Sequence, residues 1–154
     1  MDVTDGWPLG IQFVLSHIKD ENEINLIIKD LKLGNQSLET YFSEKSYNYQ
    51  SEELKDFIHK ISVVDEFHLS LCKDITQDQN THIILSYLIA NNAFITRTTH
   101  GHFKFHPLFL QFIRNKAKMA LGDLGILECS IHAANWLYNN KQSTNAIELA
   151  LKVE

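Results

Sequence analysis

Three histidines in one short stretch carry the most concentrated chemistry of this sequence. His100, His102 and His106 each offer an imidazole, which can bind a metal or donate a hydrogen bond to an anion. A tetrahedral zinc site needs a fourth ligand, and the nearest acidic residue downstream is Asp123. We therefore expect no metal site. We expect His100 and His102 to be solvent-exposed at the tip of a β-hairpin, with His106 just beyond its second strand.

The sequence shows no motif of a common catalytic site. It contains neither GxxxxGK[ST], which would cradle the phosphates of a nucleotide, nor GxSxG. Cys72 and Cys129 have no histidine at an informative spacing. We interpret the pair Asp65 and Glu66 as a polar helix entry. We therefore predict that this segment is not an enzyme and assign no catalytic residue.

A group of basic residues follows the histidines. It comprises Arg114, Lys116 and Lys118, all within one predicted helix. A few like charges on one helix are usually a solvated face. We therefore assign these residues no binding role.

Composition places the chain among globular proteins. Its 154 residues include 14 Lys+Arg and 19 Asp+Glu, a net charge of −5, and 44% are hydrophobic. The acidic balance disfavours a general binder of nucleic acid or anionic membranes. The chain lacks a disulfide framework, a signal-like N-terminus and an apolar run of about 20 residues that could span a bilayer. We expect a cytoplasmic protein with no membrane partner.

Helical periodicity dominates the first part of the chain. Pro8 is expected to open a helix, because proline suits the first helical turn. A second amphipathic helix is predicted over 21–33, with Gly34 as its stop. Its apolar residues follow the spacing i, i+3, i+4 and i+7: Ile24, Ile27, Ile28 and Leu31.

Three further helices are predicted before the histidines. Ser51 is expected to cap the first, which carries acidic residues in its first turn. The second covers 67–75, and the third begins after Asp78 or Asn80 and ends near Asn91. The expected inner face of this third helix consists of Ile83, Ile84, Tyr87, Leu88 and Ile89.

The pattern then changes to a β-hairpin followed by helices. Residues 94–98 and 102–105 are β-prone, and Gly101 lies in the predicted turn between them. Pro107 opens the next helix, and two more are predicted over 122–139 and 143–153. The predicted fold is mainly α: a winged-helix domain with one hairpin wing, and an αα-hairpin after it.

Several segments, taken in order, resemble one bacterial family. They are 4–12, 57–64, 103–109, 132–137 and 146–151. Together they are similar to the MalT-like activators of the LuxR family, which are signal-transduction (STAND) ATPases. In that family a P-loop core is followed by a winged helix, a TPR-like superhelical sensor and a DNA-binding helix-turn-helix.

The resemblance implies a domain organisation and a nucleotide site. Residues 1–34 would end the ATPase module with lid-type helices, 35–120 would form the winged helix, and 121–154 would begin the superhelix. Gly6 and Pro8 resemble the GxP motif that lies against adenine, and His106 matches a histidine that contacts the β-phosphate of ADP. A simpler alternative is that Pro8 only starts a helix and that His106 is a partly buried histidine hydrogen-bonded to a backbone carbonyl.

The function implied is regulatory and non-catalytic. ATP or ADP would bind only in the full-length parent, and the isolated segment is expected to need no cofactor. The expected partners are the ATPase core and the superhelical sensor of the same chain, with self-association on activation and DNA contact only through a separate C-terminal domain. The alternative is a stand-alone winged-helix module that contacts protein or DNA.

Overall fold

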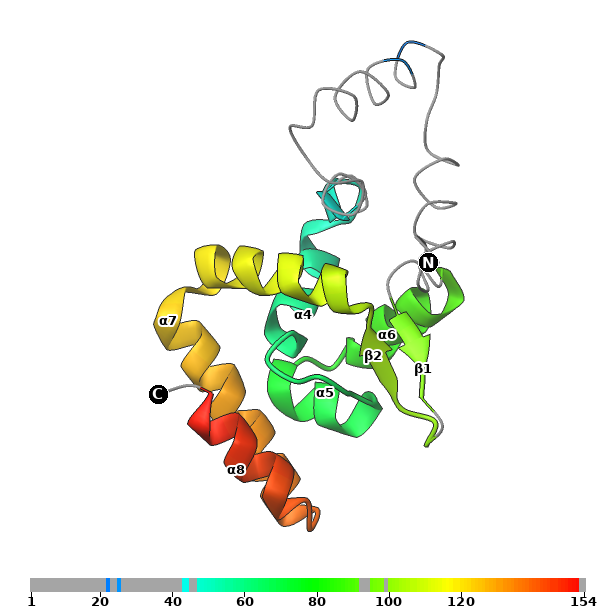
Figure 1. Cartoon of the computed structure of the whole chain (residues 1–154). Coiled ribbons are helices and arrows are strands. Elements are labelled where there is room, and N and C mark those ends of the chain that lie inside the picture. Colours follow the sequence, from blue (N-terminus) through cyan, green and yellow to red (C-terminus); the bar gives the residue numbers. More distant parts are fainter. Residues whose placement is uncertain are drawn as a thin grey trace, which may run out of the picture.

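The fold is mainly helical, with one two-stranded hairpin. The computed structural model describes residues 22, 25, 43–44, 47–91, 95–98 and 100–152 (Figure 1). In chain order its labelled elements are α4 (Glu52–Ile61), α5 (Leu69–Thr76), α6 (Thr81–Asn91), β1 (Ile95–Arg97), β2 (Phe103–Phe105), α7 (Pro107–Asn139) and α8 (Ser143–Leu151). Three helices, a hairpin and a further helix give the predicted winged helix, and the end of α7 with α8 gives the predicted αα-hairpin.

Helix α4 begins where its capping residue predicts. The Ser51 hydroxyl accepts a hydrogen bond from the Leu54 amide at 3.2 Å. Glu52 and Glu53 lie in the first turn, where their negative charges interact favourably with the positive end of the helix dipole. The apolar stripe of α4 is buried, with Ile58 and Ile61 at the centre of the core.

Phe67 is not helical, contrary to the prediction of a helix over 67–75. Its backbone pairs with Phe103 of β2 as an antiparallel bridge, and each amide donates to the other's carbonyl at 2.8 Å. Helix α5 therefore begins only at Leu69. Phe67 is fully buried. An apolar residue can be buried either in a helix or in a strand-like bridge, so the apolar pattern of the sequence does not distinguish these two structures.

The inward face of α6 also differs from the prediction. The buried residues are Thr81, Ile84, Leu85 and Leu88, whereas Ile83, Tyr87 and Ile89 are exposed. The Thr81 hydroxyl hydrogen-bonds the Thr76 hydroxyl at 2.7 Å inside the core, which turns this side of α6 inward. Because the helix is apolar almost all round, its sequence does not identify the buried face.

The hairpin forms as predicted. Ile95 lies opposite Phe105 and Arg97 opposite Phe103 in an antiparallel register. Gly101 adopts a φ of +77° in the connecting turn, a left-handed conformation that glycine accepts without steric cost.

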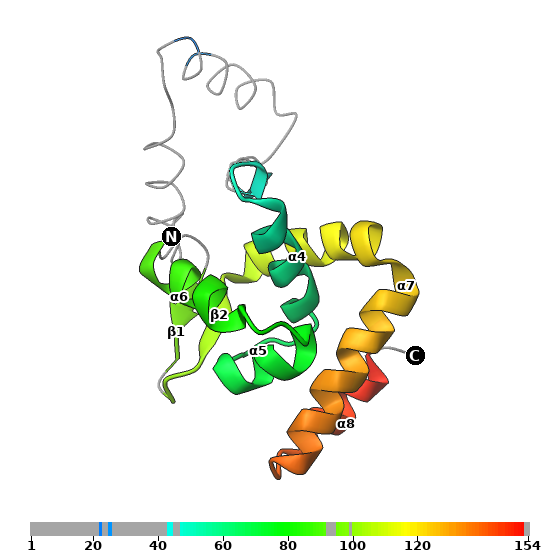
Figure 2. The ribbon, with the colours of Figure 1, turned by 180° about the vertical axis from the view of Figure 1, so that it is seen from behind.

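Helix α7 bends at Gly122, where a new helix was predicted to start. Gly122 has φ 66° and ψ 178°, so two helical arms meet at this residue. We call this bend the elbow; it separates the arm before Gly122 from the arm after it (Figure 1). Helix α8 lies along the second arm when the molecule is seen from either side (Figure 2).

One core joins the winged helix and the αα-hairpin. Its fully buried aromatic residues are Phe67, Phe105 and Phe109, and it continues into the hairpin through Cys129, Ala133, Leu137, Ala146 and Leu149. Within the described ranges, no helix has both the length and the hydropathy needed to cross a bilayer.

Candidate functional site

His106 lies between the end of β2 and the start of α7. It occupies the N-cap position of α7 with φ −57° and ψ 135°, and Pro107 follows as the first helical residue. Its side chain makes no capping hydrogen bond and is half-buried, while its carbonyl accepts a hydrogen bond from the Leu110 amide at 2.8 Å. An imidazole at this place lies beside the positive end of a long helix, where an anion is favoured. The other two predicted nucleotide-site residues, Gly6 and Pro8, lie outside the described residues.

The two histidines of the wing differ in their surroundings. His100 is exposed, as predicted. His102 is half-buried, contrary to the prediction, because its ring packs on His68 with 4.6 Å between centroids. Its Nδ1 atom also lies 3.8 Å from Glu66 Oε2. Among the described residues no group of three or more His, Cys, Asp or Glu is placed to hold a metal ion.

His68 connects the wing to the αα-hairpin. Besides His102 it contacts Trp136 of the second arm of α7, edge-on, at 4.8 Å between ring centroids. Burial, and secondarily the neighbouring His102, lowers the pKa of His68. The ring is therefore favoured in its neutral form, in which it can pack against an indole without the cost of burying a charge.

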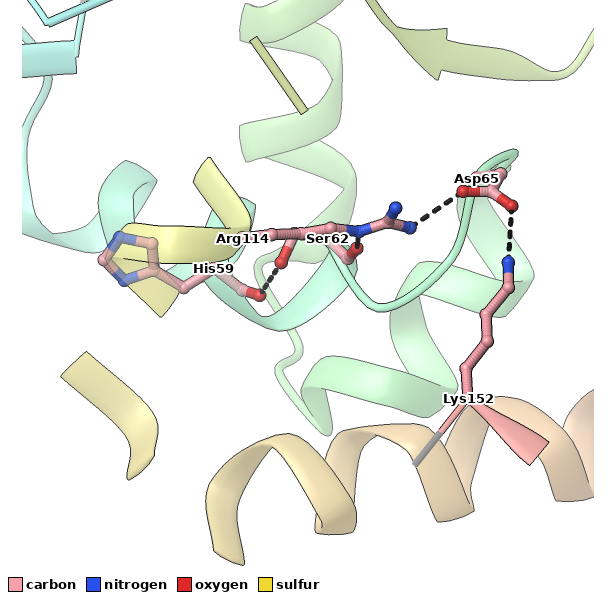
Figure 3. A network of polar contacts seen from close by, with 5 residues as sticks. All are labelled: His59, Ser62, Asp65, Arg114 and Lys152. Atoms are coloured by element: carbon pink, nitrogen blue, oxygen red, sulfur yellow. Dashed lines mark hydrogen bonds and ion pairs between the residues drawn. The ribbon is translucent and has the colours of Figure 1, made fainter. Parts of the chain in front are cut away.

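Asp65 bonds to two cations from distant parts of the chain, as Figure 3 shows. Its Oδ1 accepts a hydrogen bond from Arg114 Nη2 at 2.7 Å, and its Oδ2 accepts one from Lys152 Nζ at 3.1 Å. Arg114 also donates from Nε to the Ser62 carbonyl at 2.9 Å, and the Ser62 hydroxyl donates to the His59 carbonyl at 2.7 Å. We call Asp65, Arg114 and Lys152 the Asp65 junction.

The Asp65 junction spans the elbow. Arg114 belongs to the first arm of α7, Lys152 directly follows α8, and Asp65 lies in the segment between α4 and α5. Burial raises the pKa of Asp65, but the hydrogen bonds from Arg114 and Lys152 outweigh it, so the net pKa is lowered. A carboxylate ionised at neutral pH thus holds both cations.

The interpretation of Asp65 and Arg114 from the sequence was wrong. Asp65 is not a helix entry, and Arg114 is not merely part of a solvated face. Arg114 and Lys152 are 49 and 87 residues away from Asp65 along the chain. No spacing rule joins residues so far apart, so the sequence carried no signal for this contact.

The cysteines offer no reactive thiol. Both Cys72 and Cys129 are buried and unpaired. Burial raises the pKa of Cys72 to about 12 and also raises that of Cys129. A thiol in this state is protonated at neutral pH and is a poor nucleophile.

Comparison with known proteins finds one matching family model and several relatives. The profile of the family described as MalT winged helix domain matches residues 43–124, more than half of the chain. The serine/threonine-protein kinase PknK of Mycobacterium tuberculosis is 21% identical over 150 residues, which cover 96% of this chain and 13% of the kinase. The HTH-type transcriptional regulator MalT of Vibrio parahaemolyticus is 24% identical over 116 residues, 73% of this chain and 13% of the regulator. The chain thus spans only 13% of the length of these relatives.

Proposed function

Because this chain belongs to the MalT winged helix domain family, we propose that it is the regulatory, non-catalytic segment of a bacterial ATP-dependent transcriptional activator. In such a parent it would couple the nucleotide state of an ATPase core to a superhelical sensor. ATP or ADP would be held by the parent, and DNA would be contacted by a separate C-terminal domain. The parent would be a cytoplasmic protein that self-associates on activation.

The observation that carries the coupling role is the Asp65 junction. Coupling requires a physical connection whose contacts differ between two states. Asp65 bonds to Arg114 within the winged helix and to Lys152 at the end of α8 through exposed ion pairs. Such pairs contribute little net free energy, so the pairs themselves can be exchanged at small cost.

The names of the two relatives favour a regulatory role for this segment over a catalytic or DNA-binding role. One relative is a serine/threonine-protein kinase and another is an HTH-type transcriptional regulator. A segment similar to parts of both is better suited to a task common to them than to phosphorylation or DNA binding.

His106 is the described residue proposed to sense nucleotide. An imidazole donates a hydrogen bond to phosphate and gains a proton readily beside an anion. Its position at the N-terminus of α7 adds the positive end of the helix dipole. With Gly6 and Pro8 against the base, ADP would hold the winged helix on the ATPase core. ATP together with an inducer would release it.

The substitution His106→Ala in the full-length parent tests this role. We expect ADP to dissociate at least about tenfold faster, since a hydrogen bond to a charged group contributes roughly 1.5–3 kcal/mol. Basal transcription of the target promoter should rise as the resting state weakens. Release of fluorescent ADP and reporter output are the two measurements.

The matched control is His100→Ala, which removes an exposed imidazole from the same wing. It should leave ADP release and basal output unchanged. Unchanged ADP release and unchanged output in His106→Ala would contradict the proposal. So would equal effects of the two substitutions, because the change would then reflect the wing as a whole.

A second candidate function is a stand-alone protein-binding module. Helix α6 of the winged helix contains no Lys, Arg, Asp or Glu and exposes Ile83 and Tyr87. A helix that reads DNA needs cations for the phosphates, so this surface favours contact with protein over contact with DNA. Duplex DNA added to the chain at low salt should give no saturable shift in electrophoresis; salt-sensitive binding would reverse this order.

A further inference from the structure

A cavity of about 700 Å³ lies between the two arms of α7. The first arm contributes Arg114 and Lys118, the second arm contributes residues from Asp123 to Ser130, and the ends of α4 and α8 complete the wall. Its volume falls within the range of small-molecule sites, which is roughly 300–1,000 Å³. The cavity touches the Asp65 junction, because Arg114 and Lys152 line it.

The lining combines an apolar surface with positive charge. The apolar part consists of Val63, Leu124, Ile126, Leu127 and Leu149. The charged part consists of three cations, Arg114, Lys118 and Lys152, against the single carboxylate of Asp123. Asp65 adds a second carboxylate, bonded to Arg114 and Lys152, so the cations still outnumber the carboxylates in a chain whose net charge is −5. Apolar walls with a few convergent cations suit a small amphipathic anion.

The cations retain the capacity to bind such an anion. The guanidinium of Arg114 has five N–H donors, of which the described hydrogen bonds to Ser62 and Asp65 use two. The ammonium of Lys152 has three donors, and its bond to Asp65 uses one. Lys118 lies 3.5 Å from Asp123, and both side chains are largely exposed, so this pair is weak.

We propose that this cavity binds a small organic anion, a carboxylate on a short apolar body, which competes with Asp65 for Arg114 and Lys152. Binding would weaken the Asp65 junction and change how firmly the αα-hairpin is held to the winged helix. The site is separate from His106, so the binding step does not depend on the nucleotide switch proposed above.

Titration of the chain with octanoate tests the proposal, followed by NMR shifts of backbone amides. Saturable shifts are expected at the cavity residues, and octanol, which lacks the charge, should bind at least about fivefold more weakly. Lys118→Ala should weaken octanoate binding about two- to fivefold, whereas Lys73→Ala, on the exposed side of α5, should not.

The decisive variant is Asp65→Asn, which removes the competing carboxylate. Competition predicts that octanoate then binds about two- to fivefold more tightly, whereas a merely structural Asp65 would leave affinity unchanged or lower it. The proposal is overturned if octanoate produces no saturable shift at millimolar concentration, if octanol binds equally well, or if Asp65→Asn fails to raise affinity. Inorganic phosphate that binds as tightly as octanoate would also overturn it, since the apolar wall would then have no role.

Discussion

His59 is a buried polar residue whose protonation bears on stability. It lies in the last turn of α4 with only 4% of its surface exposed, and its Nε2 is 3.1 Å from the Tyr47 hydroxyl. Burial lowers the pKa of His59, against the smaller opposing effect of Asp56. The folded chain thus binds a proton at this ring less readily than the unfolded chain does. His68 is shifted in the same direction.

Stability should therefore fall as the pH drops through the ordinary histidine range. The stabilisation from a neutral His59 is present above the unfolded pKa of about 6.5 and is lost below it, because the unfolded chain takes up the proton first. We expect the urea midpoint to decrease between about pH 7.5 and about pH 5.5. His59→Gln should reduce this decrease and leave the share due to His68. His100→Gln, at an exposed position, should leave the decrease of the urea midpoint unchanged. If the midpoint of His59→Gln falls with pH as much as that of the unsubstituted chain, the assignment to His59 is wrong.

The elbow shows how one residue sets the relation of two helical arms. Gly122 combines a positive φ with an extended ψ, a region that residues with a Cβ atom rarely adopt. An added Cβ would meet no atom within 4 Å, so the constraint at Gly122 comes from the backbone and not from packing. The break in α7 is therefore a conformational requirement of this position.

Replacing Gly122 with alanine should destabilise the bent arrangement. We expect a loss of about 1–3 kcal/mol in the free energy of unfolding, measured by urea denaturation, because alanine is strained at this φ and ψ. Glu128→Ala, at an exposed helical position of the second arm, should change stability by less than about 0.5 kcal/mol. Equal stability of the two variants would show that the arms can straighten without penalty.

The αα-hairpin leaves apolar side chains exposed. Along the second arm of α7 they are Leu124, Leu127, Ile131 and Tyr138, and on α8 they are Ile147 and Leu151. The α7 residues recur at helical spacing and so form one stripe. In a helical-repeat protein such a stripe packs on the next repeat. At the C-terminal end of the hairpin, Leu149 is buried in the core and Leu151 is exposed.

We predict that the chain self-associates weakly through this stripe. Sedimentation velocity over a concentration series should show a dimer that Ile131→Glu weakens at least about fivefold, since a buried charge opposes association. Ile83→Glu is the matched control, because Ile83 of α6 is exposed to 57% and Ile131 to 51%. If Ile83→Glu weakens the dimer and Ile131→Glu does not, the stripe is not the interface.

Local signals were sufficient for the order and ends of most elements. The Ser51 cap, the turn at Gly101, the start at Pro107 and the break at Gly122 each depend on the conformational preference of one residue and its near neighbours. For the same reason the sequence placed His106 correctly at the entry of a helix. Such preferences act within a few residues, so they can be recognised from spacing alone.

Packing between distant segments decided the rest. The inward face of α6, the bridge of Phe67 to Phe103 and the Asp65 junction all depend on how whole elements are rotated and placed against each other. An apolar helix has several faces that could be buried, and an exposed charge has many partners within reach of its side chain. The choice among them is made by the joint packing of all elements around one core, which no local pattern in the chain encodes.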